Sequence, residues 1–167
     1  MSDMPGQTTG STGAPPGPEP GYQPQQPVAY SGSGPSGPRA GFWTRLAAMI
    51  VDWFVLAVPT IVLFLILDVG IAYALTLIGV FAYYIVLQGG PTGQTVGKKV
   101  LNIRVVDFDT GGPIGYGRAV VRELVQFLLS GILYLGYLWM LWDREKQTWH
   151  DKASRSVVVP VSAYPVQ

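Results

Sequence analysis

Two long apolar runs lie next to each other in this chain, and the first of them contains a carboxylate. The first run, Leu46 to Leu67, has 22 residues and a single charge at Asp52; the second, Val69 to Leu87, has 19 residues and no charge. Each is long enough to cross a hydrocarbon layer of about 30 Å as an α-helix. The chain is therefore predicted to be an integral membrane protein.

The distribution of the remaining charges supports this prediction. The chain has 11 Lys and Arg and 10 Asp and Glu, yet only Asp52 and Asp68 fall between Leu46 and Gly97. A soluble domain would show charged side chains on every exposed face. No continuous basic stripe of the kind that binds nucleic acid is present, and the lack of cysteine excludes disulfides, thiolate metal sites and thiol catalysis.

Residues 1–40 form a separate region that contains 9 of the 14 prolines and 8 of the 21 glycines. So little apolar surface predicts a disordered tail. The tail lacks the basic and short apolar segments of a cleavable signal peptide, so the first apolar run is expected to remain as an anchor. The predicted domain covers residues 41–160, and residues 161–167 form a short C-terminal tail.

The two apolar runs are separated by so few residues, around Asp68, that they must form an antiparallel helical hairpin. Glycine and proline then interrupt the pattern in the loop 88–118. Val100–Asp107 has the β-branched residues of a short strand, and Ser156–Val161 is a second segment of that kind.

A third apolar segment, Ala119–Trp142, has 24 residues, too few for two crossings of about 20 residues each. Arg39 and Arg45 lie beside the start of the first run and four Lys and Arg lie in the loop 88–118, whereas the link at Asp68 has none. This distribution predicts that the N-terminus and the loop are cytoplasmic. The C-terminal tail is equally basic, which favours a re-entrant or interfacial segment bent near Ser130 and Gly131. The alternative is a single crossing that leaves the tail outside. A cytoplasmic tail would let Ser156–Val161 pair with Val100–Asp107.

The expected fold class is thus all-α and integral to the membrane: two antiparallel transmembrane helices, the third helical segment and a small cytoplasmic β element. Asp52 is the residue that most needs a partner, because an ionised carboxylate in a membrane helix is costly. Arg45 lies two helical turns earlier and leans away from Asp52. The candidate partners are instead distant basic residues, namely Arg118, Arg122, Lys98 and Lys99.

Three roles for Asp52 remain open: a polar anchor between helices, a cation or proton site, and a residue that reaches the interface. Two other motifs give only weak indications of function. Gly93 to Lys98 lacks the spacing of a phosphate-binding loop. His150 and Asp151 are neighbours in sequence with no nucleophile nearby, so they are expected to be a polar loop pair. No enzymatic activity, cofactor or metal site is predicted.

Several spaced motifs together resemble the RDD family, which is named for one arginine and two aspartates. They are Gly41-Phe42-Trp43, Arg45, Ala48, Asp52, Gly93-Gln94-Thr95, Gly97-Lys98, Arg104-Val105-Val106-Asp107, His150-Asp151-Lys152 and Ser156-Val157-Val158. In this resemblance Arg45 matches the family arginine, Asp52 the first aspartate, and Asp151 or, less closely, Asp107 the second. The Pro/Gly-rich tail resembles the actinobacterial proline-rich antigen type. The resemblance implies a bacterial cell-membrane protein whose molecular role is unassigned, with transport of ions or small ligands suggested for the family.

Two function classes are therefore expected. One is transport of an ion or small ligand by a homo-oligomer, with Asp52 as the intramembrane acid, because two or three spans are few for a pathway in one copy. The other is a non-catalytic membrane adaptor whose tail recruits protein partners through extended Pro-rich segments. The candidate functional or structural polar residues are Arg45, Asp52, Lys98, Arg118 and Asp151.

Overall fold

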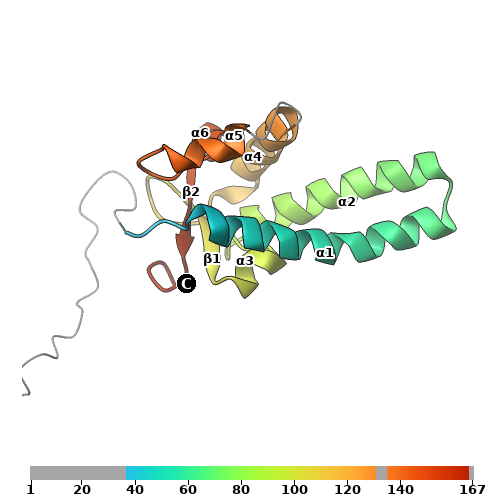
Figure 1. Cartoon of the computed structure of the whole chain (residues 1–167), viewed down its shortest axis with the longest axis horizontal. Helices are drawn as coiled ribbons and strands as arrows, with labels where there is room; N and C mark the ends of the chain where they lie inside the picture. The colour runs from blue at the N-terminus through green and yellow to red at the C-terminus, as the bar shows by residue number, and fades with distance from the viewer. Residues whose placement is uncertain (1–36, 131–134, 166–167) are drawn as a thin grey trace, which may run out of the picture.

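The structure is a computed structural model, which describes residues 37–130 and 135–165. The predicted disordered tail lies, as far as residue 36, outside the described residues. The described chain consists of a long helical hairpin and a smaller base that surrounds one end of the hairpin (Figure 1). The base contains the short helices and both strands.

The hairpin is formed by α1 (Phe42–Ile66) and α2 (Val69–Gly89), which run antiparallel as predicted (Figure 1). Both are long and apolar enough to cross a membrane. At 1.5 Å per residue the 25 residues of α1 span about 37 Å. Asp68 caps α2 by accepting a hydrogen bond from the Gly70 amide at 2.8 Å. The outward side chains of the hairpin are apolar; Leu65, for example, is 78% exposed.

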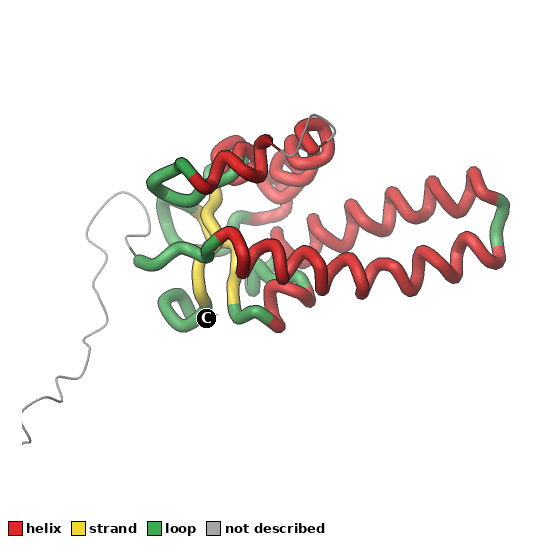
Figure 2. The backbone as a smooth tube through the Cα atoms, viewed as in Figure 1, coloured by secondary structure: helices red, strands yellow, loops and turns green. Residues whose placement is uncertain are grey.

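A short helix and a two-stranded sheet follow the hairpin. Helix α3 (Val96–Val100) leads into β1 (Ile103–Asp107), which pairs antiparallel with β2 (Ser156–Pro160) (Figure 2). The predicted pairing of the two β-branched segments is therefore present. Both faces of the sheet are buried, because Val105 packs in one hydrophobic cluster and Val106 in another.

The third apolar segment, predicted to be helical over Ala119–Trp142 with a bend near Ser130 and Gly131, differs from this prediction in its bounds and in its second half. Helix α4 (Gly115–Ser130) begins four residues earlier, α5 (Leu135–Leu138) is a single turn, and a 3-10 turn covers Trp139–Leu141. The predicted bend falls where α4 ends, at Ser130, but Gly131 lies outside the described residues. Helix α6 (Trp149–Ala153) then leads into β2.

Helix α4 packs against α2 and α6 at the base, crosswise to the hairpin (Figure 2). Its inward face contains the buried charged residues Arg122 and Glu123, whereas its outward face is apolar. The exposed apolar residues recur at helical spacing and are Val120, Val121, Leu124, Phe127 and Leu128. In water this arrangement would be costly, because exposed apolar area stays hydrated. It suits a helix whose outer face meets lipid.

Candidate functional site

A cluster of buried polar side chains fills the base, where α1, α2, α3, α4 and α6 meet. It contains two of the predicted residues as buried carboxylates, Asp52 at 1% exposure and Asp151 at 0%. The two carboxylates have different partners and are best described separately. Burying a charge is costly unless hydrogen bonds and opposite charges compensate it, so the partners define what each carboxylate does.

Asp52 accepts three hydrogen bonds from uncharged donors. The Tyr83 hydroxyl donates to Oδ1 at 2.7 Å, the Gly97 amide to Oδ1 at 2.7 Å, and the Thr95 hydroxyl to Oδ2 at 2.6 Å. The Tyr83 hydroxyl in turn accepts from the Val96 amide at 3.0 Å. Asp52 therefore joins α1 to α2 and to the start of α3.

The sequence around α3 makes this contact possible. Thr95 is the N-cap of α3, and its side chain accepts from the Lys98 amide. A Cβ atom at Gly97 would lie 2.0 Å from the Ala48 carbonyl oxygen and 2.9 Å from Cγ of Asp52. Glycine at this position lets the backbone of α3 approach α1 closely enough for its amide to reach the carboxylate.

Asp151 lies between two arginines. Its Oδ2 accepts from Nη1 of Arg45 at 2.5 Å, and its Oδ1 accepts from Nη1 of Arg122. Arg45 also donates to the carbonyl oxygens of Ala40 and Lys146, at 3.2 and 2.9 Å. Burial alone would raise the pKa of Asp151, but the Arg122 and Arg45 guanidiniums hold this pKa well below its usual range. The triad thereby ties together α1, α4 and α6.

Gln88, at the end of α2, connects the remaining charges. Its Oε1 accepts from Nε of Arg122 at 3.0 Å and from Nζ of Lys98 at 3.1 Å, while its Nε2 donates to Glu123 at 2.7 Å. Burial, with the nearby Arg122 charge, lowers the pKa of Lys98 to about 8. Burial also raises the pKa of Glu123. The charged forms of Lys98 and Glu123 are therefore less stable than those of surface lysines and glutamates.

His150 and Asp151 were expected to be a polar loop pair, but both are buried in the short helix α6. Asp151 closes a capping box with Thr148: its carboxylate accepts from the Thr148 amide, and the Thr148 hydroxyl accepts from the Asp151 amide. Burial and the Arg122 charge lower the pKa of His150 to about 3. The imidazole is therefore neutral at pH 7.

The structure corrects the expected partners of Asp52. None of the four basic candidates donates to it. Arg118 pairs instead with Asp107, which also accepts from the Asp109 and Thr110 amides in the turn after β1. Lys98 donates to Gln88, and Arg122 to Asp151. For Lys99, the fourth candidate, no side-chain hydrogen bond is formed within the described part of the chain. Of the two candidates for the second family aspartate, Asp151 is the one that contacts Arg45.

Sequence reasoning missed the uncharged members of this cluster, Tyr83, Gln88 and Thr95. One signal was available: Gln88 is the first strongly polar residue after the second apolar run, and Arg122 and Glu123 interrupt the third. Polar residues at such places usually face a protein interior. Within residues 37–130 and 135–165, no group of three His, Cys, Asp or Glu side chains is placed to hold a metal ion.

Two adjoining cavities lie beside the cluster. A polar one of about 40 Å³ is lined by four charged side chains, those of Arg45, Asp52, Lys98 and Arg122. A larger one of about 240 Å³ is mainly apolar and is enclosed by α1, α4, α5 and α6. The smaller cavity has room for a few water molecules.

Comparisons with known proteins agree with the resemblance seen in the sequence. A proline-rich antigen homolog of Mycobacterium tuberculosis is 41% identical over 87 residues, which are 50% of this chain and 36% of that protein. The proline-rich antigen of Mycobacterium leprae is 42% identical over 72 residues, 43% of this chain and 29% of the relative. The chain thus spans about a third of the length of these mycobacterial relatives.

Another relative is matched over most of its length. An uncharacterized membrane protein of Bacillus subtilis, YteJ, is 30% identical over 140 residues, 75% of this chain and 83% of that protein. No solved structure matches the chain. The RDD family matches residues 39–155, a stretch that includes Arg45, Asp52 and Asp151. The predicted family is confirmed, and the chain belongs to the RDD family.

Proposed function

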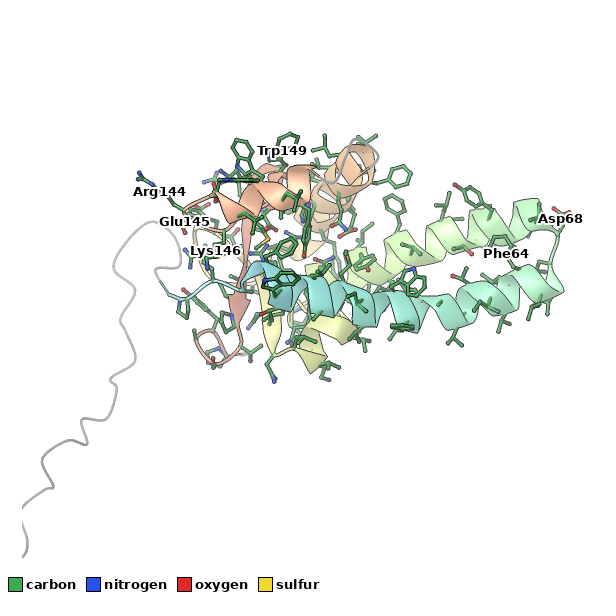
Figure 3. The ribbon with its side chains drawn as sticks, viewed as in Figure 1. Phe64, Asp68, Arg144, Glu145, Lys146 and Trp149 are labelled. Carbon is green, nitrogen blue, oxygen red and sulfur yellow. The ribbon has the colours of Figure 1, made fainter. Side chains whose placement is uncertain are left out.

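We propose that this chain is a non-catalytic membrane adaptor of the bacterial cell membrane, anchored by the two crossings of α1 and α2. The ends of the hairpin support this orientation. Asp68 is at the tip, and Arg144, Glu145 and Lys146 are at the opposite end of the molecule (Figure 3). Because Lys and Arg favour the cytoplasmic side, the base, the N-terminus and the loop 88–118 are cytoplasmic.

The third segment is proposed to enter and leave the membrane interface on the cytoplasmic side. The pairing of β1 with β2 supports this, because a chain that crossed the membrane once between the two strands would leave them on opposite sides. The outward apolar face of α4 also supports it, since an interfacial helix buries one apolar face among lipids while its polar face stays outside the hydrocarbon.

The observation that carries the adaptor proposal is the environment of Asp52. Both carboxylate oxygens are already occupied by three donors, and the side chain is 1% exposed. These donors come from α2 and from the start of α3, so the carboxylate holds helices together, and at most one of its roughly four acceptor positions is left. Beyond Asp52, the outward face of α1 has apolar residues up to the tip. The Pro-rich tail would then present extended segments to cytoplasmic protein partners.

Transport by a homo-oligomer is the second candidate, and the polar cavity favours it. Four charged side chains line this cavity at the base of the hairpin, and the exposed hairpin faces could pack against further copies. In that case Asp52 or its neighbours would titrate as an ion passes.

The Asp52→Asn variant distinguishes the adaptor from the transporter. The amide keeps the shape but puts an NH2 group in place of one carboxylate oxygen, where it faces either the Thr95 hydroxyl or the Tyr83 and Gly97 donors. An anchor therefore predicts lower thermal stability in lipid nanodiscs and unchanged ion flux per folded protein in proteoliposomes. Loss of an ion flux that the wild type conducts, with stability unchanged, would contradict the adaptor proposal.

Topology is tested separately by single cysteines, since the chain has none. Asp68→Cys should be labelled from outside the cell, and Ser162→Cys only after permeabilisation.

A further inference from the structure

The apolar cavity at the base is lined by residues of four helices, α1, α4, α5 and α6. It has a volume of about 240 Å³, and one of its lining residues, Trp149, is 37% exposed. Phe42, Leu46 and Met49 contribute one face of α1, because their spacing of four and three residues follows the helical repeat. A mainly apolar cavity of this size is large enough to take up an apolar molecule.

The polar cavity adjoins this apolar cavity directly. The two share four lining side chains, those of Met49, Gln126, Tyr137 and His150. Among them His150 is neutral, because burial and Arg122 keep its pKa at about 3. The shared wall therefore contains no charge that would repel an apolar chain, and Met49 is an unbranched, adaptable side chain.

Lys98 is the cation of the polar cavity that lacks a counter-ion. Arg45 and Arg122 both pair with Asp151, whereas no carboxylate lies within 4.0 Å of the Lys98 ammonium among residues 37–130 and 135–165. Its nitrogen donates to Gln88 at 3.1 Å and lies 6.0 Å from the centre of the Tyr84 ring. An ammonium has three donors, so two remain available beside the cavity.

We propose that the two adjoining cavities bind one long-chain fatty acid, with its alkyl tail in the apolar cavity and its carboxylate at Lys98. A carboxylate is the occupant that fits, because the polar cavity of about 40 Å³ holds only a few atoms. A glycerophosphate headgroup is too large for that space. Asp52 also lines the polar cavity, but its oxygens face Tyr83, Thr95 and Gly97.

The position of the site suits a ligand that arrives from the bilayer. The exposed apolar face of α4 includes Phe127 and Leu128 and lies on the same helix as Gln126, which lines both cavities. Only this route of entry rests on the proposed membrane placement. The binding geometry itself depends on α1, α4, α5 and α6 in the folded base.

Binding is measured on the full chain in maltoside micelles with cis-parinaric acid as the fluorescent probe and with palmitate and hexadecanol as competitors. Palmitate should displace the probe at least tenfold more effectively than hexadecanol. Lys98→Met should weaken palmitate about tenfold and leave hexadecanol unchanged, whereas Lys98→Arg should retain most of the affinity. Lys99→Met, next in the chain and exposed, is the matched control for charge and should change nothing.

Leu46→Trp is expected to fill the apolar cavity and weaken both competitors about tenfold. Its control is Leu65→Trp, on the exposed hairpin surface. Equal displacement by palmitate and hexadecanol would overturn the role of Lys98, and unchanged binding in Leu46→Trp would overturn the site. Competition by phosphatidylglycerol vesicles but not by palmitate would also contradict the proposal. If binding fails while Asp68→Cys and Ser162→Cys keep the expected labelling, the fatty-acid site is wrong and the proposed topology stands.

Discussion

In the α1–α2 hairpin, apolar side chains point outward and little is buried, whereas the base directs charged side chains inward and buries them. Leu65 is 78% exposed at the tip, and Asp151 is 0% exposed in the base. The two regions share α1, whose first two turns carry Arg45 and whose third carries Asp52. One helix thus passes from a polar interior to an apolar exterior.

This contrast shows that different forces hold the two regions. The hairpin has few internal contacts of its own, so its stability depends on the solvent around it, and lipid is the solvent that suits its surface. The base depends on internal ion pairs and hydrogen bonds, which tolerate few changes because each buried charge relies on a specific partner. Substitutions should therefore act by different physical routes in the two regions.

Asp151→Asn should produce the largest loss. It leaves the Arg45 and Arg122 guanidiniums buried without a carboxylate, and breaking such a pair typically costs about 3–5 kcal/mol. Denaturant unfolding in detergent micelles measures the free energy of unfolding. Asp109→Asn is the control, because Asp109 pairs with Arg155 at the surface, where an ion pair contributes about 0–1 kcal/mol. Equal losses in the two variants would show that the base does not depend on the triad.

Ile61→Lys tests the hairpin. Ile61 is 57% exposed on α1, about two helical turns before Asp68 at the tip, and the cost of about 2.5–3.5 kcal/mol for a lysine at the centre of a membrane helix is the upper limit for its insertion free energy. We expect a lower membrane-inserted fraction in a glycosylation-mapping assay. Val100→Lys changes a residue of similar exposure, 62%, in the base and should insert normally. Normal insertion of Ile61→Lys would place the outward face of α1 in water.

Gly97→Ala tests the close approach of α3 to α1. The added methyl group would lie 2.0 Å from the Ala48 carbonyl oxygen, so α3 must move away and loosen the bonds to Asp52. Overpacking of this kind costs about 1–3 kcal/mol. Gly117→Ala in α4 meets nothing within 4 Å, and there alanine should stabilise the helix by about 0.5–1 kcal/mol. Thermal unfolding of both variants should therefore move in opposite directions.

The sequence was sufficient for the parts of the fold that depend on composition. The hairpin followed from two uninterrupted apolar runs, and the pairing of β1 with β2 followed from two β-branched segments joined to the charge asymmetry. The bend of the third segment near Ser130 was predicted, but the reduction of its second half to the single turn α5 and a 3-10 turn was not. The apolar residues of α4 form its outer face and the charged residues its inner face, and composition alone does not distinguish that arrangement from a single span.

The partners within the site depended on three-dimensional packing. The sequence correctly marked Asp52 as needing a partner, and charge pairing suggested arginine or lysine. The carboxylate instead accepts from a tyrosine, a threonine cap and the Gly97 amide. A backbone donor has no signature in the residue type, and Tyr83 is 31 residues away in sequence. Such a contact could not be deduced from spacing on α1.

His150 gives the base a pH dependence that the hairpin lacks. The folded pKa of about 3 lies below the reference value of 6.5, so the stability from this group is full above pH 6.5 and is lost as the pH falls toward 3. The loss should reach at most about 1.4 kcal/mol per pH unit. His150→Gln should flatten unfolding free energies between pH 6.5 and 5. Both proteins are compared in a Glu123→Gln background, because the raised pKa of Glu123 acts in the opposite direction.

The smallest expected effect is a coupling of about zero between Arg118→Gln and Asp52→Asn. Arg118 pairs with Asp107 and not with Asp52, and changes at sites that share no partner add within about 0.3–0.5 kcal/mol. Tyr83→Phe with Asp52→Asn is the matched pair that should couple, by about 0.5–3 kcal/mol, because the two side chains share a hydrogen bond of 2.7 Å. Double-mutant cycles from denaturant unfolding measure both values. A coupling energy for Arg118 as large as that for Tyr83 would contradict this arrangement, because it would mean that Arg118 is a direct charge partner of Asp52.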